Sequence, residues 1–66
     1  MKDTRTLEIS RWGRHWIAQL RITPGDGTFP AGYVVTHDRI PNGKRGFPAV
    51  RRAAGKHGIT VEIHEA

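Results

Sequence analysis

The feature that most constrains the fold is an alternation of apolar and polar residues across residues 14–23. Its apolar members recur at every second position: Trp16, Ala18, Leu20 and Ile22. This spacing is that of one face of a β-strand, and Ile17 is the apolar exception on the other face. A strand with one apolar and one largely polar face is typical of an antiparallel sheet. The centre of the fold is therefore predicted to be a sheet.

Three further segments alternate in the same way and are predicted as strands, at residues 6–12, 31–37 and 59–64. Gly13 separates the first two predicted strands by so short a link that they should form a hairpin. Residues 24–27, Pro-Gly-Asp-Gly, form a turn sequence before the third strand. Residues 38–46 are rich in Pro, Asn and Gly and are predicted as a loop.

One helix is predicted, over residues 48–57. Pro48 suits a first helical position, and Gly58 suits the left-handed residue that ends a helix. Phe47, Val50 and Ala54 share one side at helical spacing. So short a helix needs packing against the sheet. We therefore expect a small two-layer α+β fold of order β-β-β-α-β, an antiparallel sheet with one short helix on one face.

The chain of 66 residues is short enough to be one domain, residues 1–66, with residues 1–5 expected to fray. It has no Cys, so neither a disulfide nor a thiolate metal site is expected. It also has no long apolar run, which favours a cytoplasmic protein without a membrane partner. Arg outnumbers Lys, and Gly and Ala are common, which suggests a bacterial or phage origin.

The positive charge is concentrated in residues 39–61, which contain six basic and no acidic residues in a chain of net charge +5. Such a surface suits the phosphates of DNA or RNA. The predicted phosphate contacts are Lys44, Arg45, Arg51, Arg52 and Lys56. A second predicted contact comprises Arg14, Arg21 and Trp12. The Gly spacing is not that of a P-loop, and no cofactor is expected.

The two tryptophans are predicted to have different environments. Trp16 is in phase with the apolar face of residues 14–23 and is predicted to lie in the core. If Leu7 and Ile9 face the core, Trp12 faces away from it. An exposed Trp12 would mark a contact site for bases, a protein or a second copy of the chain.

A set of polar residues around the predicted helix bears on catalysis: His37-Asp38, Asn42 and His57. They resemble the β-hairpin-helix metal site of HNH nucleases, and that resemblance implies a metal-dependent nuclease. In that family the pair before the loop is Asp-His, whereas here it is His-Asp, and the predicted helix carries no Asn. We therefore expect no metal site and no enzyme activity.

A second resemblance is architectural. Three antiparallel strands, a Pro-Gly-Asp-Gly turn and a helix over residues 14–57 resemble the small DNA-binding domains of phage integrase arms. The resemblance implies that strands enter the major groove. The last predicted strand, residues 59–64, has no counterpart in that pattern.

Two functions are consistent with these patterns. The first is a non-enzymatic nucleic-acid-binding module that uses the basic loop and helix. The alternative is a small protein-interaction or inhibitor module, encoded by a phage or mobile element, that docks on an acidic partner or forms a homodimer.

Overall fold

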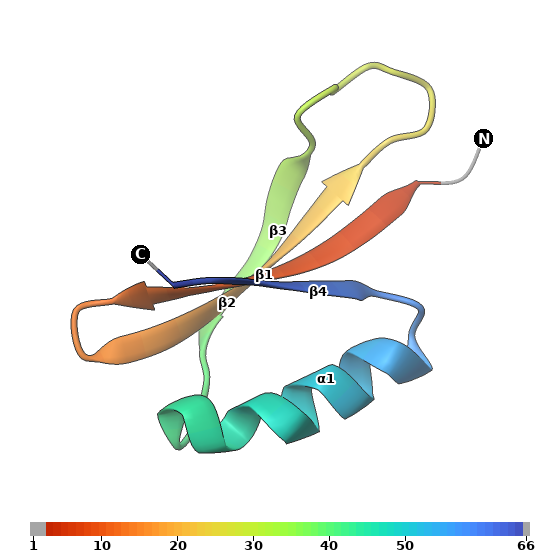
Figure 1. The fold of residues 1–66 in the computed structure, drawn as a ribbon. Coiled ribbons are helices and arrows are strands. Elements are labelled where there is room, and N and C mark those ends of the chain that lie inside the picture. The colour runs from red at the N-terminus through yellow and green to blue at the C-terminus, as the bar shows by residue number, and fades with distance from the viewer. Residues whose placement is uncertain (1–2, 66) are drawn as a thin grey trace.

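The computed structural model describes residues 3–65 and shows a four-stranded sheet with one helix on one face (Figure 1). The elements are, in chain order, β1 (Thr4–Trp12), β2 (His15–Thr23), β3 (Tyr33–Arg39), the 3₁₀-helix η1 (Gly43–Gly46), α1 (Phe47–Lys56) and β4 (Thr60–His64). The predicted α+β class and the order β-β-β-α-β are confirmed.

The order of strands in the sheet is β3-β2-β1-β4. β1 and β2 form the predicted antiparallel hairpin, and β3 pairs antiparallel to β2. β4 instead pairs parallel to β1, so the prediction of a wholly antiparallel sheet is wrong. The chain leaves β3 at one edge, crosses below the sheet through α1 and returns at the opposite edge (Figure 1). Such a helical crossover allows a strand to run parallel to its neighbour.

The strand β1 begins at Thr4, within the segment 1–5 that was expected to fray. Thr4 pairs with Thr23 at the end of β2. The carboxylate Oδ1 of Asp3 accepts a hydrogen bond of 3.2 Å from the backbone N–H of Gly25. These contacts tie Asp3 to the β2–β3 loop and Thr4 to the end of β2. Met1 and Lys2 lie outside the described residues.

The segment predicted as a loop, residues 38–46, is more ordered than its composition indicated. β3 continues to Arg39, and the N–H of Ile40 donates to the carbonyl of Trp16 at 2.8 Å. Ile40 is only 4% exposed and belongs to the core. This part of the prediction was wrong because Pro41, Asn42 and two Gly residues are typical of a loop, and a single Ile among them gave no sign that it is buried.

The core lies between α1 and the sheet. Its buried centre consists of Ile9, Trp16 and Ile40. The half-buried side chains packed around it are Ala18, Phe47, Val50, Val61 and Ile63. The rings of Trp16 and Phe47 meet edge to face, with centroids 5.1 Å apart, a favourable geometry for aromatic pairs. The core position predicted for Trp16 is thereby confirmed.

The two ends of α1 lie next to glycines. The helix covers Phe47–Lys56, one residue earlier at each end than predicted. Gly58 follows with φ of +66°, the left-handed conformation that was predicted to end the helix. Gly46 occupies the N-cap position, so no side chain caps the first turn.

Candidate nucleic-acid interface

We call Lys44, Arg45, Arg51, Arg52 and Lys56 the basic surface. All five residues are exposed, and they belong to the consecutive elements η1 and α1. Neither element contains an acidic residue. The structure therefore brings together five of the eight residues predicted as nucleic-acid contacts.

The geometry of α1 directs part of this surface away from the sheet. Val50 and Ala54 are four residues apart and face the core, as does Phe47. Arg52 lies two positions after Val50, about 200° around a helix that turns about 100° per residue. Lys56 lies one turn beyond Arg52 on the same side. Arg52 and Lys56 thus project toward solvent.

Positive charge also gathers where α1 begins. Lys44 and Arg45 stand directly before the helix N-terminus, and no acid occurs in its first turn. The helix dipole places partial positive charge at that end, so these side chains repel it. A bound anion would relieve this repulsion.

Lys44 takes part in an ion pair and in a cation–π contact. Its Nζ lies 3.1 Å from Oε1 of Glu65 and 5.6 Å from the ring centroid of Trp16. The side chains of Lys44 and Glu65 are 65% and 62% exposed. An ion pair so exposed is worth at most about 1 kcal/mol, so it leaves Lys44 free to exchange partners.

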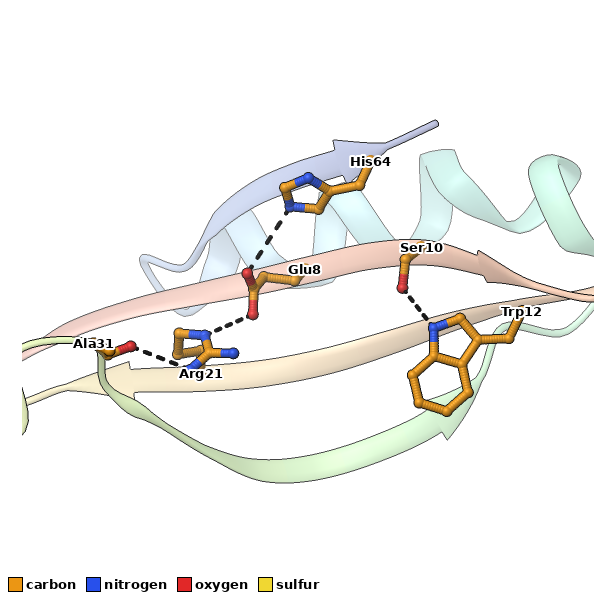
Figure 2. A network of polar contacts seen from close by, with 6 residues as sticks. All are labelled: Glu8, Ser10, Trp12, Arg21, Ala31 and His64. Carbon is orange, nitrogen blue, oxygen red and sulfur yellow. Dashed lines mark hydrogen bonds and ion pairs between the residues drawn. The ribbon is translucent and has the colours of Figure 1, made fainter. Parts of the chain in front are cut away.

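Two members of the proposed second contact, Trp12 and Arg21, lie apart from the basic surface. Trp12 and Arg21 project from the sheet face opposite α1, which we call the open face (Figure 2). Arg21 donates through Nε to Oε1 of Glu8 at 2.7 Å and through Nη1 to the carbonyl of Ala31 at 3.1 Å. Arg14 is exposed in the β1–β2 turn. The two-residue alternation already placed Trp12 on the side away from the core, but it gave no distance between these residues and the basic surface.

Trp12 faces away from the core, as predicted, and is 51% exposed. Its indole Nε1–H donates to Oγ of Ser10 at 3.1 Å, and its ring lies 4.7 Å from the ring of His37 on β3. Because β2 runs between β1 and β3, the indole must cross the open face of β2. Ile17 is the apolar residue there, and it is only 8% exposed although no helix covers it. Trp12 therefore acts partly as a cover for Ile17.

Arg39 also belongs to the open face. It pairs with Ile17 in the β2–β3 register, so its side chain projects on the side opposite α1. The continuous basic run of the sequence, residues 39–61, is thus divided between two faces. The open face in addition carries Glu8 and Glu62, which pair across β1 and β4.

The residues that resembled a nuclease site are not brought together. His37 packs on Trp12 at the open face, whereas His57 follows α1 on the other side of the sheet. The carbonyl of His57 accepts a hydrogen bond of 3.1 Å from Nη2 of Arg5. Across residues 3–65, no three His, Cys, Asp or Glu side chains gather in a way that could hold a metal ion.

One residue that the sequence reasoning missed lies beside the basic surface. Arg11 lines a hollow of about 170 Å³ together with Trp16, Lys44 and Glu65. Arg11 is the cross-strand partner of Trp16 in the β1–β2 hairpin. The hairpin around Gly13 was predicted, so its register could have placed Arg11 next to Trp16. What it could not show was that η1 would bring Lys44 to the same place.

Comparison with known proteins finds no matching family model, no similar curated protein and no similar solved structure. In the part of the chain that the structure describes, no helix has the length and apolar character needed to cross a membrane.

Proposed function

We propose that this protein is a non-enzymatic nucleic-acid-binding module that holds the sugar-phosphate backbone of DNA or RNA on its basic surface. One observation carries the proposal: five exposed basic residues follow one another along η1 and α1 without an acidic residue. Among the ion pairs between residues 3–65, only Lys44 of these five takes part. Four of the five charges therefore have no ionic partner in the described part of the protein.

The dimensions of α1 suit a line of phosphates. Ten helical residues span about 15 Å, and phosphates along one strand of B-DNA advance about 3.4 Å each along its axis. The helix can therefore lie beside roughly four phosphates of one strand. Contacts of this kind position a protein on nucleic acid and need no sequence code.

A nucleic acid fits the basic surface better than an acidic protein does. Protein interfaces favour aromatic anchors at their centre and are poor in Lys. The exposed residues of α1 that lie between the basic side chains are small, namely Pro48, Ala49, Ala53 and Gly55. Phe47 and Trp16, the aromatic side chains nearest to the basic surface, pack into the core.

The test compares two variants that remove the same charge from opposite faces, Arg52→Gln and Arg39→Gln. Fluorescence anisotropy would follow labelled single- and double-stranded DNA and RNA at low and near-physiological salt. Loss of one charge-assisted phosphate contact should weaken binding about fivefold in Arg52→Gln. Arg39→Gln should change the affinity by less than about twofold. Equal losses in both variants, or no binding by the wild type at low salt, would contradict the proposal.

A second candidate function, self-association, is favoured by a different observation. β3 is an edge strand whose seven residues are all exposed, and Tyr33, Val34 and Val35 are large apolar members of it. Exposed edge strands can pair with a second copy. An irregularity in the β2–β3 register between Leu20 and Arg21 and the charges of Asp38 and Arg39 work against such pairing.

Sedimentation velocity over a range of concentrations tests this second function. A dimer that dissociates on substitution of Val34 by Lys would support it, because a charge on the edge opposes strand pairing. A monomer at every concentration would remove it and leave the nucleic-acid proposal untouched.

A further inference from the structure

We infer that the hollow lined by Arg11, Trp16, Lys44 and Glu65 is a binding site for one phosphate group, which Glu65 occupies in place of the ligand. The inference rests on the proposed function in one respect: the phosphate is assigned to a nucleic-acid backbone that also lies on the basic surface. Lys44 belongs to both, so the hollow forms one end of that surface.

Two cationic side chains from distant parts of the sequence converge on this hollow. Arg11 comes from the end of β1, and Lys44 comes from η1. Nε of Arg11 donates to the carbonyl of Gly13 at 3.1 Å, which fixes the guanidinium at the hairpin end. The terminal nitrogens of the guanidinium remain as donors with the fork geometry that matches phosphate.

Trp16 forms a rigid wall of the site. It is buried against Phe47 and Ile40, and its backbone carbonyl accepts the N–H of Ile40. Nζ of Lys44 stands 5.6 Å from its ring centroid, a distance at which an ammonium group is attracted to the face of an indole. Lys44 is thus held close to a fixed aromatic surface, and Arg11 reaches the same hollow as the cross-strand partner of Trp16.

The carboxylate of Glu65 shows what kind of group the hollow accepts. Its Oε1 lies 3.1 Å from Nζ of Lys44, so an anionic oxygen already sits at the position that a phosphate oxygen would take. Both side chains of this ion pair are exposed to solvent, so the pair is weak. A phosphate that contacts Lys44 and Arg11 together would form stronger charge-assisted hydrogen bonds and displace Glu65.

The size of the hollow limits its ligand to a small group. Pockets for whole drug-sized ligands measure about 300 to 1,000 Å³, whereas this hollow measures about 170 Å³. A single phosphate fits this limit, with the attached sugar outside. The lining supplies two cations and one acid, so displacement of Glu65 leaves a site of charge +2 for the phosphate.

The first experiment uses a matched pair of variants, Glu65→Gln and Glu62→Gln, in which the same negative charge is removed. Glu62 lies on the open face and outside the hollow. Removal of the competing carboxylate should strengthen binding of a labelled oligonucleotide about fivefold in Glu65→Gln. Glu62→Gln should change the affinity by less than about twofold, since only screened long-range charge is altered. Equal effects of the two substitutions would overturn the inference.

The second experiment tests whether the hollow binds phosphate even if the protein binds no oligonucleotide. Inorganic phosphate and a mononucleotide are titrated into the protein, and the indole N–H signal of Trp16 is followed by NMR. Both ligands should produce a saturable change in the chemical shift of this indole N–H in the wild type, and the change should be lost in Arg11→Gln and retained in Arg39→Gln. Absence of this change in the wild type would overturn the inference that the hollow binds a phosphate group. A phosphate response without the predicted effect of Glu65→Gln on oligonucleotide affinity would overturn the assignment to a nucleic-acid backbone.

Discussion

Arg21 donates its Nε–H to Oε1 of Glu8 over 2.7 Å, diagonally across the two central strands of the sheet (Figure 2). Nε2 of His64 on β4 lies 3.9 Å from the other carboxylate oxygen of Glu8. A second nitrogen of Arg21 holds the carbonyl of Ala31 in the β2–β3 loop. Arg21 therefore stabilises the open face, and its hydrogen bonds to Glu8 and Ala31 leave it less available to bind phosphate.

The substitution Arg21→Gln should therefore affect stability more than binding. We expect the free energy of unfolding to fall by about 1 kcal/mol, because a half-buried ion pair and a loop contact are lost together. Urea denaturation measures this change, and nucleic-acid affinity should stay within about twofold of the wild type. A loss of affinity as large as that of Arg52→Gln, with stability unchanged, would show that Arg21 is a ligand contact instead.

Trp12 should contribute to stability through the residue that it covers. The substitution Trp12→Ala removes the contact with His37 and exposes Ile17, and it should lower the free energy of unfolding by about 1 to 2 kcal/mol. Trp12→Phe keeps a ring above Ile17 and should cost clearly less. If both variants are as stable as the wild type, the low exposure of Ile17 must have another cause.

The strands and the helix could be predicted from the sequence because each depends on local spacing. Two-residue alternation placed Trp16 on the core face and Trp12 on the opposite face, and both assignments are confirmed. The parallel pairing of β4 with β1 could not be predicted in this way. Alternation shows which face of a strand is buried but does not identify its neighbours, which here depend on the path of α1 beneath the sheet.

The contrast between two glycines tests the packing at the start of α1. A methyl group at Gly46 would collide with the carbonyl oxygen of Pro41 and lie 2.8 Å from Cγ2 of Ile40, whereas one at Gly55 would meet no atom within 4 Å. Gly55→Ala should therefore stabilise the protein by about 0.5 to 1 kcal/mol. Gly46→Ala should destabilise it by more than about 1 kcal/mol. Thermal or urea denaturation of both variants decides the matter, and a stabilising Gly46→Ala would contradict the described packing.

Asp26 in the β2–β3 loop gives a prediction about pH. The hydroxyl and the N–H of Thr28 donate to its Oδ1 at 2.7 and 3.0 Å and hold the pKa of the carboxyl below its ordinary value of 3.8. A lowered folded-state pKa means that the stabilisation is present above the ordinary pKa and is lost as the pH falls through the folded-state pKa. Thr28→Val removes the hydroxyl donor and should raise the pKa of Asp26, as measured by NMR titration of the carboxyl carbon. An unchanged pKa would show that the hydroxyl makes no such hydrogen bond in solution.

The candidate site was predicted only in part, for a physical reason. The basic residues of η1 and α1 are consecutive in sequence, so their common surface follows from local structure. Arg21, Arg39 and Arg11 lie on strands, where the partner of a side chain depends on residues far away in the chain. The ion pair of Arg21 with Glu8 is one such long-range relationship. The position of Lys44 and Arg11 in the same hollow is another.

The central claim is that the basic surface binds a nucleic-acid backbone, and the most direct measurement is the dependence of affinity on salt. If all five residues contact phosphates, a plot of log affinity against log salt should have a slope of about −4.5 for duplex DNA and about −3.5 for a single strand. The double variant Arg51→Gln/Arg52→Gln should reduce the duplex slope by about 1.8, because two contacts are lost. A steep slope that the double variant flattens by this amount is the result that we predict. No binding at low salt, or a slope that the double variant leaves unchanged, would contradict the account.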